Sequence, residues 1–386
     1  MAPGQTPFSL YIHIPYCALK CPYCDFNVRV VKEIPESEYR NAIVRGLAYY
    51  AGSDGWRGRG LKTIFFGGGT PSLFSAQAIG AMIDRAAEVF PFTSDIEITL
   101  EANPEDRSRF SGYRAAGVNR LSLGAQSFQP HLLRCLGRRH SVDDTHAALE
   151  ATRRQFDNFS LDLIYGIPAQ TLDDLRADLA AALDFAPPHV SAYNLTFEEK
   201  TEFHYRMKHG KIEPAAEELE IAMAATIEET LARCGLQRYE ISNYSLPGRE
   251  SKHNRVYWEG GDYLGIGAGA HSYIAGDASG AFGRRWREEK NPVRYMELVA
   301  RDGTAAMEYE KLDAAKAAAE FMFMGLRTMR GISTNEFVRR FGKRPSEVYP
   351  EIDAWLEAGL MEAESGRLRL GRRGLMVADE IFLAFV

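Results

Sequence analysis

Apolar residues recur along the first half of the chain in two alternating kinds of segment. Six short runs rich in β-branched and aromatic residues are followed by helix-like sequence, in which apolar residues have helical spacing. The runs cover residues 9–14, 63–66, 96–101, 120–123, 161–164 and 190–195, and the helical segments cover 36–50, 75–89, 142–153 and 172–185. Strands alternating with helices predict βαβ units and a parallel sheet.

Polar residues gather where these predicted strands end. In strand order they are a cysteine-rich loop, the loop 67–70, Glu101, Gln126, Asp162 and Thr196. An open doubly wound sheet concentrates its ligands at one switch point, whereas a barrel gathers the ends of all its strands around one mouth. The sequence therefore predicts an α/β fold with a partial (β/α)6 TIM-like barrel, whose opening admits a large substrate.

The pattern changes after about residue 200. A long helical stretch over 215–234 precedes a segment rich in glycine and aromatic residues, 239–273. From Leu312 onward, an alanine-rich amphipathic helix, further helical segments and the β-like run RLRL predict a small C-terminal helical, winged-helix-like domain. We expect three units: the barrel with its cysteine loop over 1–235, an extension over 236–305, and the small domain over 306–386.

Winged helices often bind DNA, so the small domain raises that possibility. Its acidic residues Glu357, Glu362 and Glu364 favour a packing or partner role instead, because acidic groups repel the phosphate backbone. The formal net charge of −6 argues likewise against nucleic-acid binding through a general basic surface.

Composition bounds the class of protein. Hydrophobic residues make up 45% of the 386 residues and charged residues 25%, as in ordinary globular proteins. No run reaches the ~18 apolar residues of a membrane span. The N-terminus MAPGQTPFSL lacks a cationic region followed by an apolar one, so we expect no secretory signal. These features predict a cytoplasmic protein in a reducing compartment, where free thiols persist.

Three cysteines, Cys17, Cys21 and Cys24, have the spacing C-x3-C-x2-C. Three thiolates can hold three irons of a [4Fe-4S] cubane and leave the fourth iron open to a small molecule. A structural zinc site needs four ligands, and no second Cys/His pair follows at suitable spacing. Five cysteines in the whole chain are too sparse, and odd in number, for a disulfide framework. The spacing favours an iron-sulfur cluster, and Cys135 and Cys234 are predicted to be ordinary semi-buried thiols.

The stretch CALKCPYC, together with the loop GGGTP over 67–71, resembles the radical S-adenosylmethionine (SAM) superfamily. That resemblance implies that the amino and carboxylate groups of SAM bind the open iron, and that the reduced cluster cleaves SAM to a deoxyadenosyl radical. The protein then orients and shields these groups. Glycines let backbone groups approach the methionine end of SAM, although the loop could be a tight turn without a ligand. The ring of Tyr23 could pack on adenine or be a hydrophobic plug.

Further motifs narrow the resemblance to the coproporphyrinogen III oxidase-like (HemN/HemW) group. They are YIHIP over 11–15, LEANP over 100–104, GAQSF over 124–128, DLIYG over 162–166 and DYLGIG over 262–267. The resemblance and the loop together predict a SAM site made by Tyr11, Tyr23, Gly68, Gly69, Thr70, Glu101, Gln126, Arg138 and Asp162. Asp162 can accept from ribose hydroxyls, Arg138 can bind a carboxylate and Glu101 an ammonium group. The alternative for Glu101 and Asp162 is a paired ion inside the barrel mouth.

One departure separates the two branches of that group. Phe26 stands where the dehydrogenase branch has another cysteine, and eight residues precede the first predicted strand, so we expect the dehydrogenase's N-terminal extension to be missing. Together with HNRVYW over 253–258, this resembles the HemW-type heme chaperones.

In that family the motif's histidine, here His253, is associated with heme. A neutral imidazole is a good heme ligand, and Tyr257 and Trp258 could flank the macrocycle. The alternative is a hydrogen-bonded turn with a core tryptophan. His271 is a second candidate ligand, and His13 is predicted to serve packing or supporting contacts.

The resemblance implies a heme chaperone that delivers heme to recipient proteins. Membrane-bound respiratory complexes are the expected recipients, with peripheral association at the inner membrane. Two alternatives stay open: an oxygen-independent coproporphyrinogen III dehydrogenase, and a radical SAM enzyme acting on another tetrapyrrole. The sequence therefore leaves enzymatic activity undecided.

Overall fold

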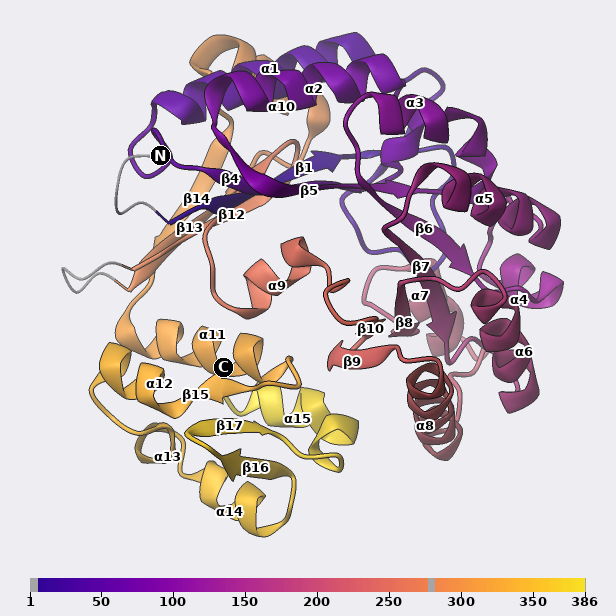
Figure 1. Cartoon of the computed structure of the whole chain (residues 1–386), viewed down its shortest axis with the longest axis vertical. Coiled ribbons are helices and arrows are strands. Elements are labelled where there is room, and N and C mark those ends of the chain that lie inside the picture. Colours follow the sequence, from indigo (N-terminus) through magenta and orange to yellow (C-terminus); the bar gives the residue numbers. More distant parts are fainter. Residues whose placement is uncertain (1–5, 277–281, 386) are drawn as a thin grey trace.

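The six predicted strands lie side by side in chain order in one curved sheet (Figure 1). The structure is a computed structural model that describes residues 6–276 and 282–385; part of the N-terminal segment assessed for a secretory signal lies outside them. The strands are β1 (Phe8–Ile14), β4 (Leu61–Gly68), β5 (Phe92–Ala102), β6 (Arg120–Gln126), β7 (Phe159–Tyr165) and β8 (His189–Asn194). Each pairs in parallel with the next, which confirms the α/β partial barrel.

Helices cover the outer, convex face of this sheet (Figure 1). They are α1 (Glu36–Gly52), α2 (Ala76–Val89), α3 (Phe110–Ala115), α4 (Pro130–Cys135), α5 (Val142–Gln155) and α6 (Leu172–Leu183). Three of the four predicted helices begin at side-chain caps: Ser75 for α2, and the capping boxes of Ser141 for α5 and Thr171 for α6. The six-residue α3 and α4 are too short to show a helical period, and the sequence did not reveal them.

The extension lengthens the sheet at both edges. On the β8 side it follows α7 (Glu202–Lys208) and α8 (Glu217–Arg233) and adds β10 (Asn243–Ser245) and β9 (Gln237–Glu240). On the β1 side it adds β11 (Tyr263–Ile266), β12 (His271–Ala275), β13 (Gly283–Glu288) and β14 (Ala306–Lys311), with α10 (Pro292–Asp302) before β14. Strand β11 pairs in parallel with β1, so seven parallel strands form the barrel wall.

Helix α9 (Lys252–Trp258) lies on the inner, concave side of the sheet, opposite the outer helices (Figure 1). It carries the HNRVYW motif, and the two sheet edges of the extension lie before and after it in the chain. The extension therefore reaches across the inside of the barrel rather than standing apart from it.

The C-terminal unit has its own apolar core, which includes Met322, Leu326, Phe337 and Ile381. Its helices are α11 (Ala314–Leu326), α12 (Thr334–Phe341), α13 (Pro345–Val348), α14 (Glu351–Glu357) and α15 (Ala378–Leu383), and its three-stranded sheet has the order β15 (Ile332–Ser333), β17 (Arg367–Leu370), β16 (Met361–Glu364). This arrangement of helices and a small antiparallel ribbon agrees with the winged-helix-like prediction. The boundaries expected between the three units stay a prediction, because β9–β14 share the barrel sheet.

No helix within the described ranges is both long enough and apolar enough to cross a bilayer.

Candidate functional site

The carboxyl ends of the parallel strands surround a cavity of about 580 Å³. Its lining includes all three clustered cysteines and every residue predicted for the SAM site: Cys17, Cys21, Cys24, Tyr11, Tyr23, Gly68, Gly69, Thr70, Glu101, Gln126, Arg138 and Asp162. Residues spread over 151 positions of sequence thus meet in one place because parallel strands end at the same edge of the barrel. Their roles as ligands stay a prediction.

The cysteine loop is closed at its base by two very short strands, β2 (Tyr16–Cys17) and β3 (Arg29–Val30), which pair in parallel. Asn27 fixes the far side of the loop, because its amide donates to the carbonyl of Ala268 (2.8 Å) and its own carbonyl oxygen bonds with His13 Nε2 (2.9 Å). His13 is thus a buried supporting residue of the loop, as the sequence predicted.

The three thiols are half-buried, and two of them accept hydrogen bonds. Thr70 Oγ1 donates to Cys17 Sγ (3.4 Å), and Arg138 Nη1 donates to Cys21 Sγ (3.6 Å). Burial raises the pKa of Cys24 to about 11 and also raises the pKa of Cys17. Donors aimed at sulfur stabilise thiolates, so this donor set fits metal-bound thiolate ligands.

Among residues 6–276 and 282–385, no three His, Cys, Asp or Glu side chains are arranged to hold a single metal ion. A cubane takes one thiolate on each of three irons, so its cysteines do not converge on a single ion. The absence of a single-ion site therefore does not conflict with such a cluster, and the three cysteines stay predicted ligands.

The glycine loop is a close approach of two backbones as well as a wall of the cavity. Gly69 N–H donates to the carbonyl of Ile14 (2.8 Å), and a Cβ on Gly69 would lie 2.7 Å from the carbonyl oxygens of both Ile14 and Tyr16. A Cβ on Gly68, whose φ is +110°, would lie 2.3 Å from the ring of His13. These glycines are thus already required by the turn, and the turn brings their backbone to the cavity.

Two carboxylates, Glu101 and Asp162, line the cavity, and neither forms an ion pair in the part of the chain that the structure describes. Glu101 accepts a hydrogen bond from Gly68 N–H (3.1 Å), and Asp162 accepts from Ser122 Oγ (2.7 Å) and Ser160 Oγ (2.8 Å). Burial, and then the charge of Asp162, raise the pKa of Glu101 to about 7. Such a pair attracts a cationic group into the cavity.

Gln126 has a backbone conformation that favours glycine, with φ of +67°. The register between β6 and β7 shifts between Gly124 and Gln126, so Gln126 lies at a β-bulge. A Cβ on Gly124 would lie 2.7 Å from Gln126 Nε2, so a side chain at position 124 would displace this amide. A strained residue at a bulge on a cavity wall is a feature of functional sites.

Arg138 links the cysteine loop to the third and fourth barrel strands. Besides its bond to Cys21, its guanidinium donates to Asn103 Oδ1 (2.6 Å) and to the carbonyl of Gly124 (3.4 Å). Asn103 was not predicted; its position directly after β5 was the available signal. The Tyr23 ring packs 6.1 Å from the Phe203 ring, beside a small apolar cluster, so it serves at least as the hydrophobic wall that the sequence offered as an alternative.

His253 is buried, with 1% of its surface exposed. Its Nδ1 bonds with Thr63 Oγ1 (2.7 Å), its Nε2 bonds with the Tyr257 hydroxyl (2.8 Å), and its ring stacks on Phe65 at 5.0 Å. Burial, and then Lys62, lower the pKa of His253 to about 3, so the ring is neutral. In this conformation both ring nitrogens are hydrogen-bonded, although His253 and Tyr257 both line the cavity.

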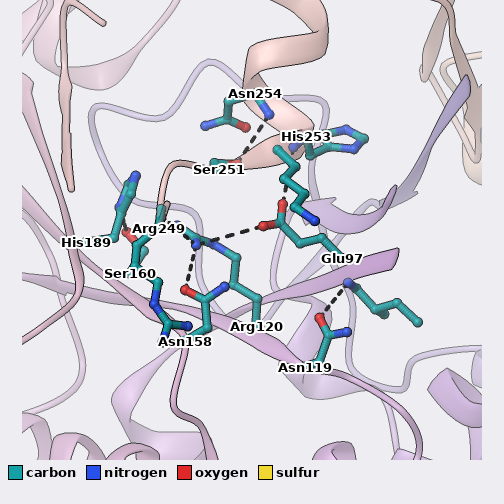
Figure 2. A network of polar contacts seen from close by, with 12 residues as sticks. Glu97, Asn119, Arg120, Asn158, Ser160, His189, Arg249, Ser251, His253 and Asn254 are labelled. Carbon is teal, nitrogen blue, oxygen red and sulfur yellow. Dashed lines mark hydrogen bonds and ion pairs between the residues drawn. The ribbon is translucent and has the colours of Figure 1, made fainter. Parts of the chain in front are cut away.

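A polar network beneath the cavity explains where His253 lies (Figure 2). The buried guanidinium of Arg120 donates to Asn158 Oδ1 (2.8 Å) and to the carbonyl of Arg249 (3.1 Å), and it lies 3.9 Å from the carboxylate of Glu97. Glu97 in turn accepts from the backbone N–H of His253 (3.2 Å). We call Arg120, Asn158, Glu97 and His253 the floor residues of the barrel. The sequence did not reveal them as a set, because an arginine inside a strand carries no recognisable motif.

His271 lies at the rim, on a second cavity of about 640 Å³ that adjoins the first. Both cavities are lined by Tyr11, Lys20, Asp25, Phe26, Val28, Gly68, Glu101 and Tyr257. Strand β12 runs antiparallel to β11, so its first residue, His271, lies at the same end of the sheet as the cysteine loop. The side chain of His271 is exposed, in contrast to His253.

Of the two isolated cysteines, Cys135 is half-buried as predicted. The prediction for Cys234 is wrong: its thiol is exposed, because it follows the last turn of α8 on the outer surface.

Comparisons with known proteins agree with this geometry. The model of the Radical SAM superfamily matches residues 11–182, and the model of the HemN C-terminal domain matches residues 312–377. The protein named heme chaperone HemW from Bacillus subtilis is 36% identical over 98% of this chain and 99% of its own length. Its namesake from Haemophilus influenzae is 35% identical over 100% of this chain and 99% of its own length.

Among solved structures, coproporphyrinogen III oxidase (HemN) from Escherichia coli, a radical SAM enzyme, superposes with a TM-score of 0.82. It covers 99% of this chain and 90% of its own length at 22% identity, which shows the shared fold. Full-length identity above 30% shows the family as well: this chain belongs to the radical SAM superfamily and, within its HemN/HemW group, to the HemW family.

Proposed function

We propose that this chain binds heme, carries a SAM-ligated [4Fe-4S] cluster, and delivers the heme to recipient proteins. The observation that carries the proposal is the full-length similarity to relatives named heme chaperones, at 36% and 35% identity. The likeness covers the barrel, the extension and the C-terminal unit together, so it concerns the whole chain and not the superfamily motif alone.

In this proposal Cys17, Cys21 and Cys24 hold the cluster. Thr70 and Arg138 donate to the sulfurs of Cys17 and Cys21, and such hydrogen bonds tune the reduction potential of iron-sulfur clusters. When bound, the cluster supplies an electron for SAM cleavage. The superfamily assignment over residues 11–182 supports both cofactors.

The predicted SAM contacts divide by chemistry. Glu101 and Asp162 present two carboxylate groups to the cavity, suited to an ammonium group and to ribose hydroxyls. Gln126, held by the bulge, presents an amide, and Arg138 presents a guanidinium. Tyr11 and Tyr23 supply aromatic walls. A cationic SAM near Glu101 would stabilise its carboxylate and lower the pKa that burial has raised.

Heme is the cargo. The cavity is lined by exposed apolar side chains of the cysteine loop, with Leu19 at 50% and Phe26 at 62% exposure. Apolar side chains beside polar groups suit a flat macrocycle with charged substituents. The prediction that His253 ligates heme requires its ring to leave Thr63 and Tyr257 first.

Delivery requires a protein recipient, and by family resemblance membrane-bound respiratory complexes are the proposed class. Peripheral association with the inner membrane is part of the same proposal. The acidic hairpin of the C-terminal unit is the part that we expect to meet a partner rather than nucleic acid, and Glu362 and Glu364 there both lie near Arg369.

The proposal is tested by anaerobic reconstitution of the full chain with iron and sulfide, followed by parallel assays. We expect about four irons per chain by metal analysis, a paramagnetic signal of the reduced cluster that changes on adding SAM, and one heme per chain by titration. Cys24→Ala should lose the cluster, and Cys234→Ala, which changes an exposed thiol outside the cavity, should keep it.

The same samples separate the alternatives. Protoporphyrinogen formation from coproporphyrinogen III, under reduction with SAM, would establish the dehydrogenase function instead. A chain with an intact cluster that does not bind heme would overturn the chaperone proposal.

A further inference from the structure

The cavity of about 580 Å³ continues below the predicted SAM site. We call its deep part the lower cavity, which is lined by Thr99, Arg120, Ser160, His189, Ser191 and His253. Arg120 is the first residue of β6 and Gln126 is the last, so their Cα atoms lie roughly 20 Å apart along the strand. SAM is predicted at the Gln126 end, beside the cysteine loop. The lower cavity therefore has no ligand assigned to it.

Two side chains of the lower cavity have a polar atom without a hydrogen-bond partner among the described residues. These atoms are Oγ1 of Thr99 and Nη2 of Arg120. Each residue keeps 1% of its surface exposed, so bulk water does not replace the missing partner. Buried polar groups are almost always hydrogen-bonded, and an orphaned one indicates a missing partner such as a water molecule, an ion or a ligand.

The two orphaned groups are neighbours in the sheet. Thr99 of β5 and Arg120 of β6 are paired in the parallel register, and adjacent strands lie about 5 Å apart. Side chains at paired positions project to the same face of the sheet, and both residues line the cavity. The lower cavity thus holds a hydroxyl and a guanidinium nitrogen side by side, and neither has an acceptor.

The rest of the Arg120 guanidinium is already fixed (Figure 2). Its Nη1 donates to Asn158 Oδ1 (2.8 Å) and to the carbonyl of Arg249 (3.1 Å), and Glu97 lies 3.9 Å from the same nitrogen. These contacts hold the planar group in one orientation and leave Nη2 for a further acceptor. A carboxylate suits this position, because a charged oxygen strengthens a hydrogen bond from a guanidinium.

Arg120 also lies close to the histidine that is predicted to bind heme iron. Glu97 accepts from the backbone N–H of His253 (3.2 Å) with Oε1, and its Oε2 lies 3.9 Å from Arg120 Nη1. One carboxylate therefore separates His253 from Arg120, and both line the same cavity. Heme carries two propionates on one edge of its macrocycle. The carboxylate of SAM, in contrast, is predicted at the cluster, at the other end of β6.

We propose that Arg120 and Thr99 bind one propionate of heme in the lower cavity. This inference rests on the proposed heme-binding function and deepens it, because it names residues that orient the macrocycle while His253 stays the predicted iron ligand. The propionate accepts one hydrogen bond from Nη2 of Arg120 and one from Oγ1 of Thr99. Both orphaned donors then have an acceptor, and no covalent bond forms or breaks.

Thr99 provides the test, because Arg120 also holds the other floor residues in place. Valine has nearly the shape of threonine, and Thr99 Oγ1 has no partner in the part of the chain that the structure describes. Thr99→Val should therefore leave the free energy of unfolding in urea undiminished. In ferric heme titration of the full chain, after anaerobic cluster reconstitution, it should weaken heme binding about tenfold, the effect of losing one hydrogen bond to a charged group.

Two further variants control for the substitution itself. Thr99→Ser keeps the hydroxyl and should bind heme nearly as tightly as the parent. Ser9→Ala removes another buried hydroxyl that lacks a partner among residues 6–276 and 282–385, but Ser9 is not a lining residue of the cavity. It should change neither stability nor heme affinity.

The ligand is varied to identify the source of the carboxylate. In heme dimethyl ester the propionates carry no charge, so the parent should bind the ester about tenfold or more weakly than heme. Thr99→Val should lose less affinity for the ester than for heme. The change that SAM causes in the paramagnetic signal of the reduced cluster should be the same in Thr99→Val and in the parent.

The outcomes separate the two levels of the proposal. If the parent chain does not bind heme, the proposed function fails. If the parent binds heme and Thr99→Val binds it as tightly, the propionate site fails while the function stands. Equal losses for heme and its ester, or weaker SAM binding with unchanged heme binding, would likewise overturn the site. A loss of stability in Thr99→Val would show that the hydroxyl has a partner within the protein, which also contradicts it.

Discussion

Side chains on the floor of the barrel are buried and bonded to protein groups, whereas those on its rim are exposed. On the floor, Arg120, Glu97 and His253 are buried and bonded to one another or to neighbouring strands (Figure 2). On the rim, Phe26 of the cysteine loop and His271, the first residue of β12, are exposed. The two histidines that the sequence offered as heme ligands fall one in each region.

This difference helps to distinguish residues that support the structure from residues that can bind a ligand. A buried polar group without its partner costs the full penalty of desolvation, so floor groups hold each other in place, although Arg120 and His253 also line the cavity. A rim group has already kept its contact with water and can exchange it for a ligand. Substitutions should therefore affect folding on the floor and binding on the rim.

The largest effect is expected from Arg120→Ala. It leaves the carboxylate of Glu97, whose side chain is 5% exposed, without its cationic neighbour. Breaking a buried pair in this way costs about 3–5 kcal/mol. Unfolding by urea, followed by circular dichroism, measures the loss. The surface pair of Arg154 and Glu150 gives the control, because Arg154→Ala should cost less than about 1 kcal/mol. Equal losses for the two variants would show that the floor is no more demanding than the surface.

Glu101, between the floor and the rim, should make stability depend on pH. Its pKa in the folded chain is raised to about 7, so the folded state holds the proton more firmly than the unfolded chain, in which the pKa is near 4.5. The contribution of Glu101 to the free energy of unfolding is then greatest below pH 4.5. It falls as the pH rises to 7, by on the order of 2 kcal/mol after allowing for partial contact with water.

Glu101→Gln removes this dependence, because the amide does not titrate. The thermal midpoint of the cluster-free parent, minus that of the variant, is measured between pH 5 and pH 8. We expect this difference to decrease as the pH rises. A difference that stays constant would show that Glu101 ionises as it does in water.

Thr63→Val tests whether the His253 ring is part of the floor. The valine has nearly the same shape, but it leaves His253 Nδ1 without its 2.7 Å bond, so we expect a loss of about 1–2 kcal/mol. Ser9→Ala is a matched control, since its buried Oγ has no partner among the described residues and its removal should cost nothing. Stability unchanged in Thr63→Val would mean that the ring is not held there.

The smallest effect on folding is expected from Phe26→Ala at the rim. The side chain is 62% exposed, so the free energy of unfolding should change by less than about 0.5 kcal/mol. Heme affinity should nevertheless fall several-fold, since Phe26 lines both cavities. Measuring both quantities on one preparation sharpens the comparison, and a stability loss as large as that of Thr63→Val would contradict it.

Much of this protein is determined by its sequence alone. The six barrel strands and four of the outer helices follow from local periodicity, and three of these helices, α2, α5 and α6, also carry their own side-chain caps. Three features lie directly after or at the end of predicted strands: the loop with Cys17, Cys21 and Cys24, the glycine loop, and Glu101. The sequence could therefore place them at one mouth before any tertiary contact was known.

Tertiary structure decided what these local signals do not contain. Strand β11 lies in the glycine- and aromatic-rich extension, where the sequence predicted no strand, yet its pairing with β1 adds the seventh parallel strand. The His253 ring is hydrogen-bonded to Thr63, 190 positions away in the chain. This bond requires helix α9 to lie on the concave side of the sheet. Hydrogen bonds and burial at such separation arise only when the sheet has closed, so the sequence named two histidines and only the fold shows that His253 is buried and His271 exposed.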